Sequence, residues 1–132
     1  MAEVERRAAA YRLPSVAWPE PWPGNTLVAM RAATFAKQTG RTVSFALAAF
    51  RQAFVAGKDL TDPDNVLLAA AACELHPRSV LKALETDVVK GALREATEEA
   101  AAAGVKGVPS LAVDGEVFWG DDRLEEALAA AS

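Results

Sequence analysis

The only sheet that the sequence predicts is one short hairpin near its C-terminal end. Ser110–Val113 and Glu116–Trp119 have the character of short strands, and Asp114–Gly115 between them is a strong two-residue hairpin signal. An isolated two-stranded hairpin is marginally stable in water, so it needs a helix against it, further strands beside it, or both. The sequence supplies helices but no further strand. We therefore expect a partner chain, or an additional N-terminal segment, to complete the sheet.

The rest of the chain is predicted to be mainly helical. Alanine accounts for 30 of the 132 residues, and it loses no side-chain entropy in a helix. Glycine, proline and capping residues divide the chain into predicted helices at 2–13, 26–39, 42–56, 64–75, 77–84, 86–103 and 123–131. Asn25 is a predicted N-cap, Asp62 and His76 each precede a proline at the first helical position, and Asp121 or Asp122 is expected to cap the last helix.

Apolar spacing on two helices predicts which of their faces are buried. In helix 42–56 the large apolar residues are spaced by four, three and four, which gives one stripe along the helix. The residues expected to face the core are Leu27, Met30, Ala33 and Phe35 in helix 26–39, and Val43, Leu47, Phe50 and Phe54 in helix 42–56. Short loops join the five helices of this region, so a compact helical bundle is the expected packing.

A proline-rich segment separates the first helix from this bundle. Residues 14–23 hold four prolines and two tryptophans, so the segment must run extended. Its composition favours a rigid linker whose tryptophans pack on neighbouring helices over a boundary of a ligand pocket. We predict three parts: a helix and Pro/Trp-rich linker over 1–24, a helical domain over 25–104, and a β-β-α part over 105–132.

Composition and charge exclude several classes of function. The chain carries 14 Lys and Arg against 18 Asp and Glu, a net charge of -4, which argues against a nucleic-acid partner. A single cysteine rules out an internal disulfide framework and a multi-cysteine metal site. The charged N-terminus lacks the pattern of a signal peptide, and the longest apolar stretch, 66–73, is too short to cross a bilayer. We expect a soluble cytoplasmic protein with no membrane partner and no metal.

No catalytic triad can be assembled from these residues. The only histidine, His76, stands in a helix-capping context, and a local structural role is favoured over a catalytic one. Cys73 lies among alanines without a second cysteine, so a small buried side chain is favoured over a reactive thiolate. The adjacent acidic pairs at 98–99 and 125–126 are predicted to be solvated.

A candidate binding site lies at the hairpin. If the Val108–Pro109 bond is cis, the backbone of Val108 turns outward and can pair with an extended, peptide-like ligand. Asp121 and Asp122 stand at the start of a helix, where they could hold an ammonium group while neighbouring backbone N–H groups hold a carboxylate. A zwitterionic peptide suits such a site. The alternative, that Pro109 only interrupts the strand and the aspartates only cap the helix, is equally consistent with the residues.

The same residues carry a resemblance to a known family. The run Gly107-Val108-Pro109, the hairpin and Phe118-Trp119-Gly120-Asp121-Asp122-Arg123-Leu124 resemble the C-terminal end of DsbA-like thioredoxin-fold proteins. Within that fold, the chain resembles the 2-hydroxychromene-2-carboxylate isomerases and the kappa-class glutathione transferases. Residues 18–23, 25–32, 45–50 and 59–62 are similar to that family's inserted helical domain. The implied fold class is α/β: an incomplete, mostly α DsbA-like thioredoxin fold, with an inserted helical bundle followed by a β-hairpin and a helix.

The resemblance implies a glutathione-dependent isomerase, which catalyses cis-trans isomerisation of an aromatic-degradation intermediate through a thiol adduct. Glutathione, or another low-molecular-weight thiol, is the implied cofactor. The implied thiol-binding residues are Val108, Pro109, Trp119, Gly120, Asp121 and Asp122, and the implied substrate-facing residues are Trp22 and Asn25. The alternatives are a non-catalytic thioredoxin-like binding module and a DsbA-like thiol oxidoreductase relative.

The chain departs from the family at its N-terminal end. Family members begin with a strand-helix-strand unit that carries the serine or cysteine facing the thiol, and this chain resembles about the last two thirds of such a protein. Ser15, Ser44 and Ser110 do not stand in a context that replaces that residue. We therefore assign no catalytic residue here and expect activity only if another chain or a longer gene product supplies the unit. A homodimer, or pairing with another chain through the open sheet edge, is the expected assembly.

Overall fold

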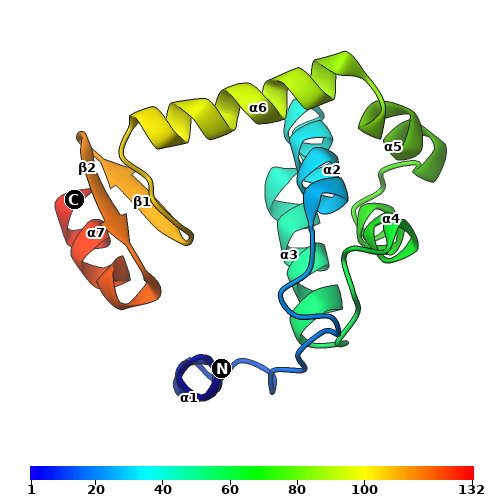
Figure 1. The fold of residues 1–132 in the computed structure, drawn as a ribbon. Helices are drawn as coiled ribbons and strands as arrows, with labels where there is room; N and C mark the ends of the chain where they lie inside the picture. The colour runs from blue at the N-terminus through cyan, green and yellow to red at the C-terminus, as the bar shows by residue number, and fades with distance from the viewer. The chain divides into compact units, whose positions relative to one another are not determined.

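The computed structural model describes all 132 residues and contains the predicted hairpin and helices (Figure 1). It divides into two compact units, Met1–Lys90 and Gly91–Ser132, and we describe each unit by itself. The helical unit holds α1 (Ala2–Ala10), α2 (Leu27–Gln38), α3 (Thr42–Phe54), α4 (Pro63–Ala72), α5 (Pro77–Leu84) and the first turn of α6 (Asp87–Ala102). The C-terminal unit holds the rest of α6, β1 (Ser110–Val113), β2 (Glu116–Trp119), the 3-10 turn η1 (Asp121–Arg123) and α7 (Leu124–Ala130).

Small side chains form much of the core of the helical unit. Ala32 and Ala36 of α2, and Ala69 and Ala70 of α4, are almost completely buried, and α2 contacts α3, α4 and α5. Alanine leaves little volume between helix backbones, so these helices approach closely around one large side chain, Phe45 of α3. The alanine content that predicted helices therefore also determines how tightly the helices pack.

The predicted buried faces of α2 and α3 are largely wrong. Leu27 and Met30 are 45% and 49% exposed, and Val43, Leu47 and Phe50 are 71%, 51% and 59% exposed. The residues that pack inward are Ala29, Ala32 and Ala36 of α2, and Phe45, Ala49 and Ala53 of α3. Each helix carries two apolar faces, and the face with the smaller residues is the buried one. Of the predicted set, Ala33 and Phe35 do pack against the core from partly buried positions.

Two helix starts follow the predicted capping pattern, and the predicted N-cap of a third is wrong by one residue. The side chain of Asp62 accepts a hydrogen bond from the Asp64 N–H at 2.9 Å, and Nδ1 of His76 accepts one from the Arg78 N–H at 3.2 Å. Asn25 is not the N-cap residue itself, which is Thr26, but its Oδ1 accepts from the Leu27 N–H at 3.1 Å. The first helix is shorter than predicted and ends at Ala10, because the chain turns through a positive φ of 57° at Arg12.

The proline-rich linker packs against α3 in the way that its composition favours. The rings of Trp18 and Trp22 lie 5.9 Å and 5.4 Å from the ring of Phe54, and both meet it edge-on. The Ala17 N–H donates to the Phe54 carbonyl at 2.8 Å, which fixes the linker to the end of α3. The prediction that the tryptophans pack on a neighbouring helix is confirmed.

The C-terminal unit is built on a two-stranded antiparallel sheet. Asp114 and Gly115 both have positive φ, 49° and 86°, as the tightest hairpin turn requires, and they pair Val113 with Glu116. Phe118 is 2% exposed and lies on the sheet face that α7 covers, where the Arg123 guanidinium stacks 4.8 Å from its ring centroid. No helix of the chain is both long enough and apolar enough to cross a membrane.

Candidate functional site

The entry to β1 is shaped by a close contact between Gly107 and Trp119. A Cβ atom at Gly107 would lie 2.8 Å from Nε1 of Trp119, so only glycine lets the indole ring lie against this turn. Ser110 Oγ donates to the Gly107 carbonyl at 2.6 Å and closes the turn from the other side. The Val108–Pro109 bond between them is cis. The turn therefore has a defined shape, and Trp119 is part of it while remaining 55% exposed.

The edge of β1 away from β2 is open, and Val108 lies two residues before this strand. In an antiparallel pair, the backbone N–H and C=O groups of one residue hydrogen-bond to the partner strand, and those of the next residue point away from it. Val113 and Leu111 bond toward β2 in this register, and the Gly120 N–H donates to the Pro109 carbonyl at 3.0 Å. Ser110 and Ala112 alternate with these residues, so their N–H and C=O groups face away from β2. Val108 lies before the strand and the cis bond, and its own N–H and C=O make no hydrogen bond within the chain. The Val108 side chain is 88% exposed, which leaves the edge accessible from its end.

The two predicted aspartates follow directly after the hairpin. Gly120 has a φ of 109°, a conformation that other residues rarely adopt, and it turns the chain into η1. Asp121 is half-buried and Asp122 is exposed. The prediction that one of them caps the last helix is wrong, because Gly120 occupies the N-cap position of η1 and Arg123 that of α7. Both carboxylates lie in the first turn of η1, directly after the end of β2.

Arg123 is held in place by two acidic residues and a ring. It donates to both carboxylate oxygens of Glu126 at 2.7 Å and 2.8 Å, and it lies 3.8 Å from Glu116. The hydrogen bonds from Arg123 hold the pKa of Glu126 below its usual value, and they raise the pKa of Arg123. With its charge satisfied in this way, Arg123 helps to fix η1 and α7 against β2.

The structure brings together the six predicted thiol-binding residues within the C-terminal unit. They lie on the turn before β1, the end of β2 and η1. Trp22 and Asn25, predicted to face the substrate, belong to the helical unit, where both are exposed. The assignment of these eight residues to a thiol and a substrate stays a prediction.

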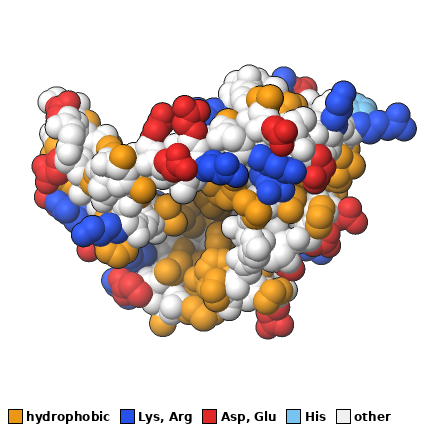
Figure 2. Space-filling model, turned by 45° about the horizontal axis from the view of Figure 1, so that its top comes forward, with side chains coloured by type: hydrophobic (Ala, Val, Ile, Leu, Met, Phe, Trp, Pro, Cys, Tyr) orange, Lys and Arg blue, Asp and Glu red, His pale blue; other side chains and the backbone are white.

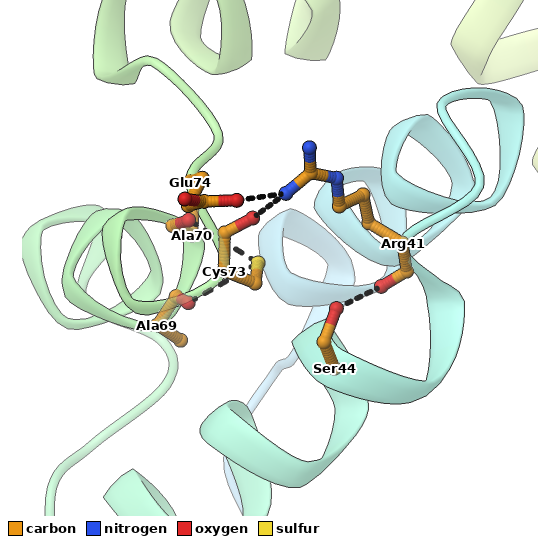
Figure 3. Close-up of polar contacts among 6 residues, drawn as sticks. All are labelled: Arg41, Ser44, Ala69, Ala70, Cys73 and Glu74. Carbon is orange, nitrogen blue, oxygen red and sulfur yellow. Dashed lines mark hydrogen bonds and ion pairs between the residues drawn. The ribbon is translucent and has the colours of Figure 1, made fainter.

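Cys73, the one cysteine of the chain, and Arg41 beside it have structural roles in the helical unit. Cys73 is buried, and its thiol donates to the carbonyls of Ala69 and Ala70 (Figure 3). Arg41 approaches the same helix end, donating to the Cys73 carbonyl at 2.6 Å and pairing with Glu74 at 3.0 Å. Its charge therefore lies at the C-terminus of α4, where the helix dipole favours a cation. No group of three or more His, Cys, Asp or Glu side chains is placed to hold a metal ion.

Sequence reasoning missed Gly107 and Ser110 as parts of the site. Both shape the turn that presents Val108, and neither belongs to a binding motif that depends on its side chain. The sequence signal that could have identified this turn is a glycine two residues before a proline at the start of a predicted strand. Its contact with Trp119, twelve residues further on, depends on the hairpin register.

Comparison with protein families decides the classification. A family model described as a DSBA-like thioredoxin domain matches residues 1–131. The chain belongs to the DSBA-like thioredoxin domain family. The predicted fold class is thereby confirmed, with a mainly helical part followed by the hairpin and its helix.

Two proteins that are similar to this chain carry the same description. The chain is 29% identical over 125 residues to a 2-hydroxychromene-2-carboxylate isomerase from Sphingobium xenophagum, covering 95% of this chain and 63% of the relative. The solved structure of a selenomethionine-labelled 2-hydroxychromene-2-carboxylate isomerase (HCCA isomerase) superposes with a TM-score of 0.85 at 19% identity. That superposition covers 98% of this chain and 62% of the solved chain, and it shows that the fold is shared. The chain therefore spans less than two thirds of the length of either protein.

Proposed function

We propose that this chain contributes the thiol-binding surface of a glutathione-dependent isomerase of the 2-hydroxychromene-2-carboxylate isomerase type. The reaction would be cis-trans isomerisation of an aromatic-degradation intermediate, in the cytoplasm, with kappa-class glutathione transferases as relatives. The observation that carries the proposal is the free backbone of Val108 beside the exposed Trp119 and the carboxylates of Asp121 and Asp122. The similarity to two proteins with this name supports the same assignment.

The hairpin has the groups that an extended zwitterionic peptide needs. The edge of β1 offers the N–H and C=O of Val108 for main-chain pairing, as an added strand would receive. The two aspartates at the end of β2 supply negative charge for the ammonium group of a γ-glutamyl end. Glycine at 107 and 120 lets the Trp119 indole and the Asp122 carboxylate lie close against the backbone. These residues fit glutathione or a similar low-molecular-weight thiol.

In this proposal, the chain binds and orients the thiol, and a group from elsewhere activates it. Bound glutathione would supply a thiol that adds reversibly to the substrate and so permits rotation about a double bond. The residues of the hairpin would bind the peptide and orient that thiol. Ser110, the one hydroxyl near the turn, donates to the Gly107 carbonyl and is not directed at a ligand. We therefore expect the group that activates the thiol to come from another chain or from a longer form of this one.

A non-catalytic binding module is the second candidate, and the open edge of β1 favours it. The same N–H and C=O groups that would pair with a peptide ligand can pair with a strand of another protein. A thiol oxidoreductase is less well supported, because Cys73 is buried in the helical unit and bonded to helix carbonyls. Thiol-disulfide exchange would need an exposed cysteine, and this sequence contains no cysteine besides the buried Cys73.

Calorimetric titration with reduced glutathione tests the proposal. We expect saturable binding, and we expect Asp122→Asn to weaken it about tenfold, the effect of losing one charge-assisted hydrogen bond. Glu125→Gln is the matched control, because it removes the same charge from an exposed position in the same unit. Absence of heat at millimolar glutathione, or equal weakening by both variants, would contradict the assignment of the site.

A further inference from the structure

The helical unit holds a pocket of about 330 Å³ where the C-terminal half of α2 meets α5 and the first turn of α6. Ser79, Lys82 and Ala83 of α5 line this pocket, and Lys82 and Ala83 follow Ser79 by three and four residues, which places all three on one side of the helix. A volume of this size is at the lower end of the range of small-molecule sites, about 300–1,000 Å³. The pocket therefore suits a compact molecule rather than a peptide or a helix.

The buried part of the pocket lining is apolar. Phe35 of α2 packs against the core from a partly buried position, and Ala83 and Val89 are 7% and 2% exposed. The Thr86 hydroxyl, which also lines the pocket, donates to the Ala83 carbonyl at 2.8 Å and accepts from the Val89 N–H at 3.3 Å. The inner surface thus offers a ring and methyl groups, and it fits an apolar group that needs no hydrogen bond.

The outer edge of the pocket carries free hydrogen-bond donors. Gln38, Ser79 and Lys82 line it and are exposed, and their side chains make no hydrogen bond or ion pair within the chain. The acidic residue nearest to Lys82 in the sequence, Glu85, pairs with Lys90 at 3.3 Å. Basic side chains (blue) lie beside hydrophobic ones (orange) on the helical part of the molecule in Figure 2. A lysine without an acidic partner beside an apolar pocket favours an anionic ligand, and hydroxyl and amide groups can donate to the same carboxylate.

We propose that this pocket is a binding site for a small monocarboxylate with an apolar body. The apolar body would lie against Phe35, Ala83 and Val89, and the carboxylate would accept hydrogen bonds from Lys82 and Ser79 at the outer edge. A neutral analogue of such a ligand forgoes the charge-assisted hydrogen bond, and a cationic analogue is repelled by Lys82. The site therefore discriminates by charge as well as by shape.

The pocket is separate from the residues predicted to face the substrate. Trp22 and Asn25 precede the first turn of α2, whereas Phe35 and Gln38 belong to the C-terminal half of this helix of 12 residues. All of these residues lie in the helical unit. The proposal therefore adds a second site and does not rest on the proposed thiol chemistry.

Titration of the full chain with phenylacetate at neutral pH, followed by backbone amide signals in NMR spectra, tests the site. A ligand of this size is expected to bind with a dissociation constant on the order of 1 mM. We expect saturable shifts at the amides of residues 35–38 and 79–90. Phenylacetamide should bind about fivefold more weakly, and phenethylamine and acetate should give no saturation. Shifts that grow without saturation, equal binding of the acid and the amide, or shifts centred on the hairpin would overturn the proposal.

Two matched pairs of variants locate the ligand. Lys82→Gln should weaken phenylacetate about fivefold and leave phenylacetamide unchanged, because it removes only the charge at the edge of the pocket. Lys58→Gln, the same change at an exposed lysine in the loop after α3, should alter neither affinity. Val88→Ser should weaken phenylacetate about threefold, whereas Val43→Ser, at an equal exposure of 71% on α3, should not. Binding that is unaffected by both Lys82→Gln and Val88→Ser would rule out this pocket.

Hydrogen exchange shows whether binding stabilises the start of α6. Val89 is the one buried residue of this helix, so a ligand that lies against it opposes the opening of the first turn. The Lys90 amide donates to the Thr86 carbonyl at 3.1 Å and reports on this turn. With phenylacetate at about ten times its dissociation constant, exchange of the Lys90 amide should slow by up to about tenfold. Unchanged exchange at saturation would contradict the proposed contact with Val89.

Discussion

The two units of this chain are built on very different amounts of buried apolar surface. Fifteen of the buried hydrophobic residues belong to the helical unit, and only Phe118 and Ala127 belong to the C-terminal unit. In the helical unit, α2, α3, α4 and α5 all contribute to one core. In the C-terminal unit a hairpin of two four-residue strands packs on a seven-residue helix. The helical unit thus has a core of its own. The C-terminal unit, which carries the candidate site, buries one aromatic ring, and the exposed edge and face of its sheet are free to make stabilising contacts.

The prediction with the largest expected effect tests which side of α3 is buried. Phe45→Ala should lower the free energy of unfolding of the helical unit by about 3–5 kcal/mol, because it leaves a cavity among closely packed alanines. Phe50→Ala removes the same ring from the exposed side of the same helix and should change the free energy by no more than about 0.5 kcal/mol. Urea unfolding followed by circular dichroism at low protein concentration measures both. Equal destabilisation by the two variants would show that the side of α3 that carries Phe50 is also part of the core.

A second substitution tests whether the C-terminal unit unfolds separately. Phe118→Ala removes the one large buried side chain of this unit and the ring that Arg123 stacks on. We expect the β1 and β2 amides to lose most of their protection against hydrogen exchange, while protection in α2 to α5 is unchanged. If protection fell equally in both units, the two would form one cooperative structure and the contrast between them would be wrong.

Much of the secondary structure could be predicted because local chemistry determines it. Both strands have the predicted bounds, since the Asp114–Gly115 turn fixes their register. The helix over Pro77–Leu84 also has the predicted bounds, because His76 and Pro77 define where it starts. Predicted helix ends that no such residue defines agree less well with the structure. The first helix ends early because Arg12, which is not a glycine, adopts a left-handed conformation.

The buried faces could not be predicted from spacing alone. The buried stripe is all alanine on α2 and is Phe45 with two alanines on α3, whereas the opposite stripe of each helix holds more of the large apolar residues. Hydrophobic spacing gives preference to the stripe with more large side chains. Which stripe is buried depends on how closely the neighbouring helices approach, and that is a property of the assembled bundle. The open edge of β1 is similar, since the residues that face it follow from the register that the Gly120–Pro109 hydrogen bond continues across the hairpin.

The smallest expected effect concerns the pH dependence of the C-terminal unit. Hydrogen bonds from Arg123 lower the pKa of Glu126 in the folded state, so the unfolded chain binds a proton more readily than the folded one. This pair therefore stabilises the unit above the ordinary carboxylate pKa, and the contribution is lost as the pH falls through the lowered value. Between about pH 5 and about pH 3, wild type should lose slightly more hairpin protection, after correction for intrinsic exchange, than Glu126→Gln. Glu125→Gln removes the neighbouring charge without touching the Arg123 hydrogen bonds and should behave as wild type. An identical pH dependence in wild type and Glu126→Gln would mean that the Arg123–Glu126 pair does not stabilise the hairpin. The buried residues Phe118 and Ala127 would then hold α7 against it, in contrast to the many buried residues of the helical unit.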